Sequence, residues 1–139
     1  NKYIGDAIMA IFGVPLANEN QALDAYKCCL DMRKKLTELN KELEAENLPS
    51  IKFGIGLHTG NVLAGNIGSN SRMEYTVIGD AVNVASRIES LCKEYNCDLL
   101  ISETTVEAIV TCENALPQIQ SIGETQIRGR KSAISIYKG

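Results

Sequence analysis

The sequence has no apolar run that approaches the roughly 18 residues needed for a membrane-spanning helix. It also has no basic excess, since 14 Lys and Arg residues stand against 17 Asp and Glu residues, for a net charge of −3. A nucleic-acid-binding surface needs such an excess. We therefore expect no nucleic-acid partner and no membrane contact by this segment. A nucleoside triphosphate remains a possible ligand, because a few well-placed cations are enough to bind one.

Signals for export and for metal clusters are missing too. The chain opens at Asn1 with neither a signal peptide nor a methionine, which indicates a piece excised from a longer protein. The five cysteines are odd in number and their spacing fits no zinc site. We expect free thiols in a reducing cytoplasm, with a parent protein that is either soluble or tethered to a membrane.

The 139 residues are enough for one domain, residues 1–139, with an ordinary globular share of 45% hydrophobic and 22% charged residues. No internal repeat or linker divides them. Periodicity and turn residues predict mixed strands and helices. Strands are expected at 2–4, 7–12, 51–58, 73–78, 99–101, 119–127 and 133–137, and helices at 18–47, 81–95 and 102–109.

Local signals refine these elements. Asn18, followed by Gln21, is a candidate capping box for the first helix, and Asp80 is a candidate N-cap for the second. The glycine-rich stretch 60–68 is a candidate for a short helical turn. Strand hairpins mixed with helices predict an α+β fold, in which helices pack on a largely antiparallel sheet.

Asp6 follows Gly5 at the tip of the first expected hairpin. A carboxylate held there is open to a ligand and suits Mg²⁺, a hard cation that prefers oxygen ligands. The plainer interpretation is a turn aspartate, because Asp tolerates turn geometry.

A second polar group begins the helix expected at 81–95. Asn83 and Arg87 are four residues apart and share one helix face. An amide and a guanidinium on one face can hold a sugar oxygen and a phosphate. The alternative is a polar face in solvent.

The remaining candidates are weaker. The glycines at 54–60 and 65–68 form neither a phosphate loop nor a dinucleotide-binding fingerprint, because no Gly-Lys-Ser/Thr follows and the spacing is wrong. His58, the single histidine, has a structural interpretation at a strand end. The turn at Arg128 and Arg130 is either solvated surface or a contact for a terminal phosphate.

Taken together, three segments carry a family resemblance. They read Lys-x-Ile-Gly-Asp-Ala, then Gly-Ile-Gly-x-His-Thr-Gly, then Tyr-Thr-Val-Ile-Gly-Asp-x-Val-Asn-x-Ala-Ser-Arg. In order and spacing the chain resembles the class III adenylate and guanylate cyclase catalytic domain, over essentially its whole length. The resemblance implies a ferredoxin-like α+β core, a head-to-tail homodimer with active sites at the interface, and Mg²⁺ or Mn²⁺, two ions per complete site.

The resemblance also implies roles for six residues. Asp6 matches a metal-binding aspartate, Asn83 the residue that orients the ribose, and Arg87 the residue that stabilises charge at the α-phosphate. Lys2 and Thr76 match the pair that reads the purine. Arg128 stands where the family usually has a lysine for the outer phosphates, and its planar fork differs from an ammonium. Asp6 would come from one protomer and Lys2, Thr76, Asn83 and Arg87 from the other.

The purine pair favours ATP. Lys2 can donate a hydrogen bond to adenine N1 and Thr76 can accept one from the 6-amino group, whereas guanine reverses this edge and the family's guanylate cyclases tend to carry Glu and Cys. A mismatched polar pocket rejects the wrong base strongly. We expect an adenylate cyclase, in which the ribose 3′-hydroxyl attacks the α-phosphorus and pyrophosphate leaves as cyclic AMP forms.

The family's other metal aspartate lies in a strand upstream of the first hairpin, and residues 1–139 contain no such segment. We therefore expect a domain that lacks its first strand and the helices that follow it, has an open sheet edge able to pair with another chain, and is inactive alone. The alternatives are a guanylate cyclase, a degenerate cyclase domain that regulates by binding nucleotide, and an unrelated ferredoxin-like binding module.

Overall fold

A computed structural model describes residues 2–69, 72–112, 118–126 and 133–139. The helices are α1 (Gln21–Ala45), α2 (Asp80–Leu91) and α3 (Glu103–Cys112). The strands are β1 (Lys2–Ile4), β2 (Ala7–Met9), β3 (Ile55–Leu57), β4 (Leu63–Ser69), β5 (Arg72–Ile78), β6 (Leu99–Ser102), β7 (Gln120–Thr125) and β8 (Ile134–Lys138). The expected α+β class is confirmed.

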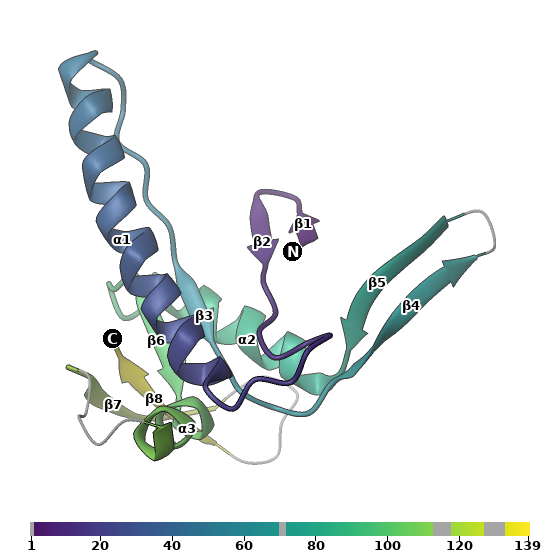
Figure 1. Ribbon diagram of the computed structural model, residues 1–139. Helices are drawn as coiled ribbons and strands as arrows, with labels where there is room; N and C mark the ends of the chain where they lie inside the picture. The colour runs from purple at the N-terminus through teal and green to yellow at the C-terminus, as the bar shows by residue number, and fades with distance from the viewer. Residues whose placement is uncertain (1, 70–71, 113–117, 127–132) are drawn as a thin grey trace.

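The strands form one four-stranded sheet and two separate hairpins. The sheet has the order β3-β6-β8-β7, in which β3 and β6 run parallel and the other pairs run antiparallel. The β1–β2 and β4–β5 hairpins each pair only internally among the described strands. Among the described strands, β3 and β7 are therefore the two edges of this sheet. Figure 1 shows β4–β5 as an arm that extends away from the sheet.

Apolar residues from both sides of the sheet form two core clusters. Alternate residues of β6 point to opposite faces. Leu99 and Ile101 pack with α1 and α3, whereas Leu100 packs with α2 and with Ile136 of β8. All four side chains are almost fully buried. This strand, buried on both faces, reads as a continuous apolar run, as is typical of a strand covered by helices.

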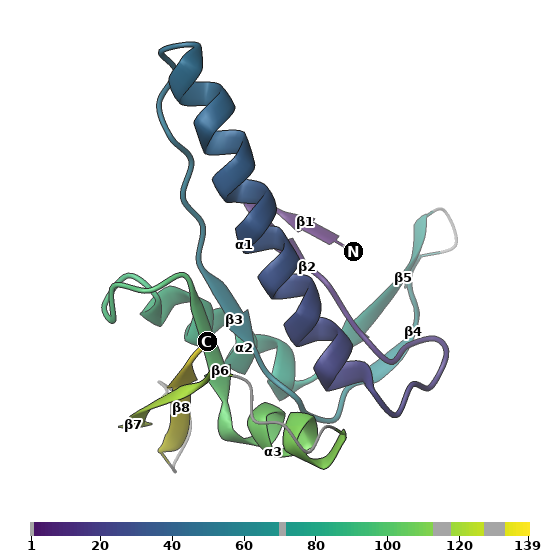
Figure 2. The same cartoon turned by 60° about the vertical axis from the view of Figure 1, so that its left-hand side comes forward.

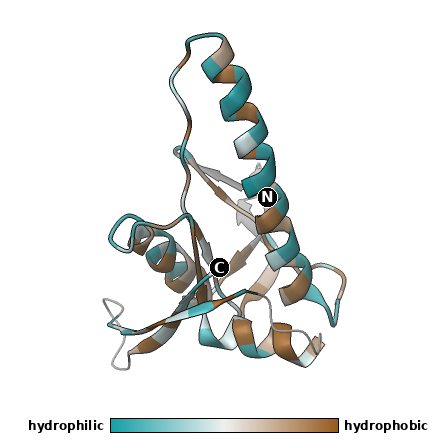
Figure 3. Cartoon of the chain, turned by 90° about the vertical axis from the view of Figure 1, so that its left-hand side faces the viewer, coloured by the Kyte–Doolittle hydropathy of each residue, from teal (hydrophilic) through white to brown (hydrophobic). Residues whose placement is uncertain are grey.

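Helix α1 is only partly packed on this body. Its buried residues all lie in the first third of the helix, and the remainder projects outward (Figure 2). Apolar and hydrophilic segments alternate along its length (Figure 3). The chain after α1 runs back along the helix, where the Asn40 side chain pairs with both backbone groups of Ile51. The projecting half is thus supported mainly by this returning segment.

The structure corrects four local expectations. Strand β2 ends at Met9 and β3 covers only three residues, so both are shorter than expected. The glycine-rich stretch 60–68 contributes to strand β4, not a helical turn, because cross-strand pairing with β5 overrides its weak strand propensity. The helix begins after Asn20, and the Asn18 side chain bonds Asp24 and the Asn20 N–H instead of capping the helix.

Candidate active site

The β1–β2 hairpin carries Lys2 and Asp6. Its register pairs Lys2 with Met9 and Ile4 with Ala7, which leaves Gly5 and Asp6 as the two-residue turn. Gly5 has φ of +62°, a conformation that glycine adopts at little cost, and a Cβ there would meet nothing. Backbone geometry therefore explains the glycine, and Asp6 lies exposed at the tip. In Figures 1 and 2 this hairpin lies between α1 and the β4–β5 arm.

Thr76 lies on β5, opposite Gly65 of β4. Because side chains alternate along a strand, Thr76 shares its face with Ile78 and with Leu63, the partner of Ile78. Ile78 is 55% exposed and Leu63 72% exposed, whereas Val77 on the opposite face is buried. Thr76 is therefore half-buried beside an uncovered apolar surface.

Gly79 joins β5 to α2 and is the N-cap of that helix, so the expectation that Asp80 caps it is wrong. Gly79 has extended backbone angles, and the Val82 N–H bonds its carbonyl at 3.2 Å. A Cβ at Gly79 would lie 3.0 Å from the Asn61 carbonyl oxygen. Close approach of two chain segments therefore requires glycine here, and Asp80 becomes the first helical residue, where its charge favours the helix dipole.

Helix α2 presents Asn83 and Arg87 beside its buried side. Asn83 is exposed and Arg87 half-buried. Val84 and Ile88 are fully buried in the core cluster that includes Leu100. Because the buried side fixes the rotation of α2, Asn83 and Arg87 are held on a rigid element, only a short link away from Thr76.

His58 belongs to a network of hydroxyl groups that the sequence pattern did not reveal. Its Nδ1 lies 2.8 Å from the Ser102 Oγ, which lies 3.1 Å from the Thr105 Oγ1. The Thr104 hydroxyl donates to the Thr59 carbonyl at 3.0 Å. These bonds join the carboxyl ends of β3 and β6 to the start of α3, which agrees with a structural role for His58. The pattern Ser-x-Thr-Thr after a buried strand is the signal that could have indicated it.

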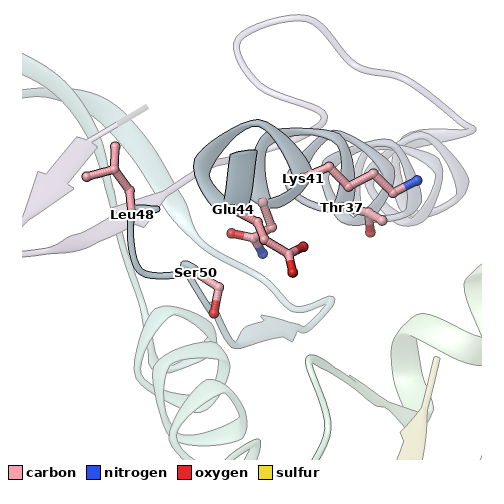
Figure 4. A pocket seen from close by; sticks show the side chains of 6 residues that line it. Thr37, Lys41, Glu44, Leu48 and Ser50 are labelled. Carbon is pink, nitrogen blue, oxygen red and sulfur yellow. The ribbon is translucent and has the colours of Figure 1, made fainter. Parts of the chain in front are cut away.

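Two shallow grooves lie elsewhere, along the outer half of α1. One, of about 530 Å³, lies between α1 and the chain that follows it and is lined by polar residues such as Thr37, Lys41 and Glu44 (Figure 4). The other, of about 420 Å³, includes Phe53 and Asp98. Neither groove is lined by a predicted site residue. Arg128 lies outside the described residues.

The side chains near the tip of the β1–β2 hairpin show whether this region could bind the expected Mg²⁺ or Mn²⁺. No group of three His, Cys, Asp or Glu side chains gathers among the residues that the structure describes. At this tip the exposed carboxylate is that of Asp6. Mg²⁺ is commonly held by one or two carboxylates together with substrate phosphates and water. Asp6 therefore fits as one ligand of such an ion, and a second ion needs another carboxylate.

The model of the adenylate and guanylate cyclase catalytic domain matches residues 2–138. The chain belongs to this family. It is 42% identical to an adenylate cyclase of Anabaena cylindrica, over 99% of this chain and 27% of that protein. It is 39% identical to the terminal-differentiation-specific adenylate cyclase of Dictyostelium discoideum, over 99% of this chain and 6% of that protein. The chain thus spans about a quarter or less of these two relatives.

Solved structures of cyclases have the same fold. The guanylyl cyclase Cya2 is 34% identical, with a TM-score of 0.82, over 99% of this chain and 66% of that one. The adenylyl cyclase CyaB from P. aeruginosa is 29% identical, with a TM-score of 0.85, over 99% of this chain and 68% of that one. The cyclase-type fold expected from the sequence is therefore confirmed. Within the described ranges, no helix is long and apolar enough to cross a bilayer.

Proposed function

We propose that this domain, in its full-length protein, converts ATP into 3′,5′-cyclic AMP and pyrophosphate. One observation carries the proposal: the segment from Thr76 to Arg87 folds as a strand, a close-packed glycine and a helix, with Val77 and Val84 buried and the side chains of Thr76, Asn83 and Arg87 half-buried or exposed. Adenylate cyclases are among the relatives that this chain resembles, at 42% and 39% identity. Family membership supports a cyclase reaction, and the residues at the purine positions support ATP.

Each proposed role comes from the family resemblance, and the chemistry of each side chain agrees with it. Lys2 donates to adenine N1, and the Thr76 hydroxyl accepts from the 6-amino group. Asn83 orients the ribose so that its 3′-hydroxyl lies in line with the α-phosphorus, because positioning supplies much of the catalysis in such a transfer. Arg87 offers charge-assisted hydrogen bonds to the α-phosphate oxygens as negative charge grows there. Arg128 is proposed to contact the outer phosphates.

Asp6 is the proposed ligand of Mg²⁺ or Mn²⁺ on the triphosphate. A divalent cation bound there would offset phosphate charge and lower the pKa of a coordinated hydroxyl. The chain's own contribution is an exposed, fixed carboxylate at a tight turn. Since residues 1–139 match only one carboxylate of the expected pair, we propose that these residues are inactive on their own.

We further propose that the active unit is a homodimer. Asp6 then comes from one protomer, and Lys2, Thr76, Asn83 and Arg87 come from the other. Support comes from the exposed apolar pair Leu63 and Ile78, which lies on the same face of the arm as Thr76. Covering this pair with a second copy would remove apolar surface from water and enclose the nucleotide.

A guanylate cyclase is the second candidate, because the similar Cya2 structure is a guanylyl cyclase. Lys2 and Thr76 present the hydrogen-bonding pattern for adenine, so we place GTP second. Replacing Lys2 with Glu and Thr76 with Cys should lower cyclic AMP formation and raise cyclic GMP formation. If these replacements leave the preference for ATP unchanged, the proposed purine roles are wrong.

The test of function is an assay of the full-length protein with ATP or GTP, in Mg²⁺ or Mn²⁺, measuring both cyclic products. We expect cyclic AMP, its loss in Asp6→Ala, and normal activity in the matched variant Asp31→Ala, which removes an exposed carboxylate from α1. Residues 1–139 alone should give no product. A folded, dimeric full-length protein that forms neither cyclic nucleotide would overturn the enzyme proposal in favour of a regulatory nucleotide-binding domain.

A further inference from the structure

Helix α2 is followed by a tight turn with a characteristic hydrogen-bond pattern. The Cys97 N–H donates to the Cys92 carbonyl at 3.0 Å, and the Asn96 N–H donates to the Lys93 carbonyl at 3.4 Å. Asn96 has φ of +47°. This pair of bonds, one joining the first and sixth residues of the turn and one joining its second and fifth residues, is the Schellman motif, and Asn96 is its left-handed residue. In this motif the residues that the 6→1 bond joins, here Cys92 and Cys97, frequently touch through their side chains.

The end of α1 has the same motif with different side chains. The Leu48 N–H donates to the Leu43 carbonyl at 2.8 Å, the Asn47 N–H donates to the Glu44 carbonyl at 3.0 Å, and Asn47 has φ of +57°. Two leucines therefore occupy the contact positions in α1, and two cysteines occupy them at the end of α2. The cysteines are suited to the ordinary apolar contact, because a free thiol behaves as a small apolar group.

The two thiols lie in different environments. Cys92 is 2% exposed and its thiol donates to the Ile55 carbonyl of β3 at 3.4 Å, whereas Cys97 is half-buried. Cys97 packs against the core cluster that contains Cys92, and burial raises the pKa of the Cys92 thiol to about 12. Cys97 is therefore the thiol that a small reagent reaches first, and Cys92 lies across the same turn.

We propose that Cys92 and Cys97 form a modification site, at which a peroxide oxidises the two thiols to a reversible intrachain disulfide. In the first step the Cys97 sulfur attacks one peroxide oxygen, the O–O bond breaks, and Cys97 becomes a sulfenic acid as water leaves. In the second step the Cys92 sulfur attacks the Cys97 sulfur, the S–O bond breaks, and a second water carries away the Cys92 proton. Two thiols are oxidised and one peroxide is reduced to two waters.

The other cysteines are not prepared for this reaction. Cys28 and Cys29 are neighbours within α1, where successive side chains point in different directions. Cys28 is exposed and Cys29 is buried. The Cys112 thiol donates to the Glu19 carbonyl at 3.3 Å. Cys28 therefore serves as an internal reference, because it is more exposed than Cys97 but has no thiol partner across a turn.

The site does not depend on the proposed cyclase activity, so its test needs no activity assay. The reduced full-length protein is treated with a small excess of hydrogen peroxide, quenched with acid, alkylated and digested for mass spectrometry. We expect the peptides that contain Cys92 and Cys97 to be joined, with a mass about 2 Da below that of the two thiols. A thiol reductant should restore both alkylation sites, and Cys28→Ser should leave the result unchanged.

The matched variant is Cys97→Leu, which copies the leucine of α1 and keeps the apolar contact while removing the thiol. We expect it to fold and to leave Cys92 fully alkylated after peroxide treatment. Two outcomes would overturn the proposal. One is oxidation of Cys97 to a sulfinic acid while Cys92 stays reduced. The other is modification of Cys28 at peroxide doses that leave the 92–97 pair intact.

Discussion

The four-stranded sheet and the two outlying hairpins are held in different ways. The sheet, with α2 and α3, buries Leu100, Ile101 and Ile136 completely. The β1–β2 and β4–β5 hairpins pack chiefly on themselves and leave Ile8, Leu63 and Ile78 more than half exposed. Lys2, Asp6 and Thr76 lie on these hairpins, whereas Asn83 and Arg87 lie on the buried framework. The comparison supports the proposal of a shared site, in which a second protomer covers the exposed hairpins.

The largest expected effect is in the sheet. Ile101→Ala removes a fully buried side chain and should lower the free energy of unfolding by about 2–5 kcal/mol. Ile78→Ala, on the arm, should change it by less than about 0.5 kcal/mol. Urea denaturation at concentrations that keep the protein monomeric measures both. Equal losses in the two variants would remove the distinction between framework and hairpins.

A charge placed on the β4–β5 arm should weaken dimerisation but leave the stability of the monomer unchanged. Leu63→Asp places a carboxylate in the exposed apolar pair, and we expect a dimer dissociation constant raised about tenfold or more. The unfolding midpoint of the monomer should not change. Analytical ultracentrifugation measures the first quantity and urea denaturation the second. An unchanged dissociation constant would mean that this face is not the dimer surface.

The ion pair between α1 and the segment after α2 should contribute less to the free energy of unfolding than a buried side chain of the sheet does. Arg33 bonds both oxygens of Asp98 at 2.7 Å and the Gly139 carbonyl at 2.9 Å. Both side chains are more than a third exposed, so solvent weakens the pair, and Arg33→Ala should cost about 1 kcal/mol of unfolding free energy. Arg33→Lys should keep only part of it, because an ammonium lacks the planar fork. Lys35→Ala, in a fully exposed pair, is the control and should have no measurable effect.

Effects of a similar size are expected at the two left-handed asparagines. Asn96→Ala removes a short polar side chain that can hydrogen-bond locally and so tolerates the left-handed region, and it should lower the unfolding free energy by about 1 kcal/mol. Asn47→Ala should do the same at the end of α1. Asn96→Gly should not destabilise the protein, since glycine adopts this conformation readily. Thermal unfolding compares the variants. A larger loss in Asn96→Gly than in Asn96→Ala would contradict the assigned motif.

The sequence predicted the elements better than their ends. Long periodic segments such as α1, and strand runs such as β6 and β8, were recognised because burial imposes a period that the residues display. Strand β4 was missed, because Gly65 and Gly68 are poor strand residues and only their pairing with β5 makes them extended. The predicted N-caps Asn18 and Asp80 were wrong, because the helices begin after Asn20 and Gly79. Both predicted residues are good capping residues close to the observed starts, so local contacts of the chain determined where each helix begins.

The sequence predicted a set of candidate site residues but not their arrangement. The block from Thr76 to Arg87 identified the family, because its polar and apolar positions both match. The network around His58 was not predicted. The Ser-x-Thr-Thr pattern was a signal for it, but Ser102 and Thr105 are far from His58 in sequence and meet it through the parallel pairing of β3 and β6. Roles for Lys2 and Asp6 remain predictions that depend on a second protomer.

The most direct test of the shared site is complementation between two inactive variants of the full-length protein. Asp6→Ala and Arg87→Ala damage opposite halves of the proposed site, so each alone should lose most cyclic AMP formation. When their subunits mix in one population, half the dimers are mixed and each mixed dimer has one intact site, so activity should return to about a quarter of normal. If mixed dimers form and no activity returns, Asp6 and Arg87 do not act across a subunit interface, and the central claim is wrong.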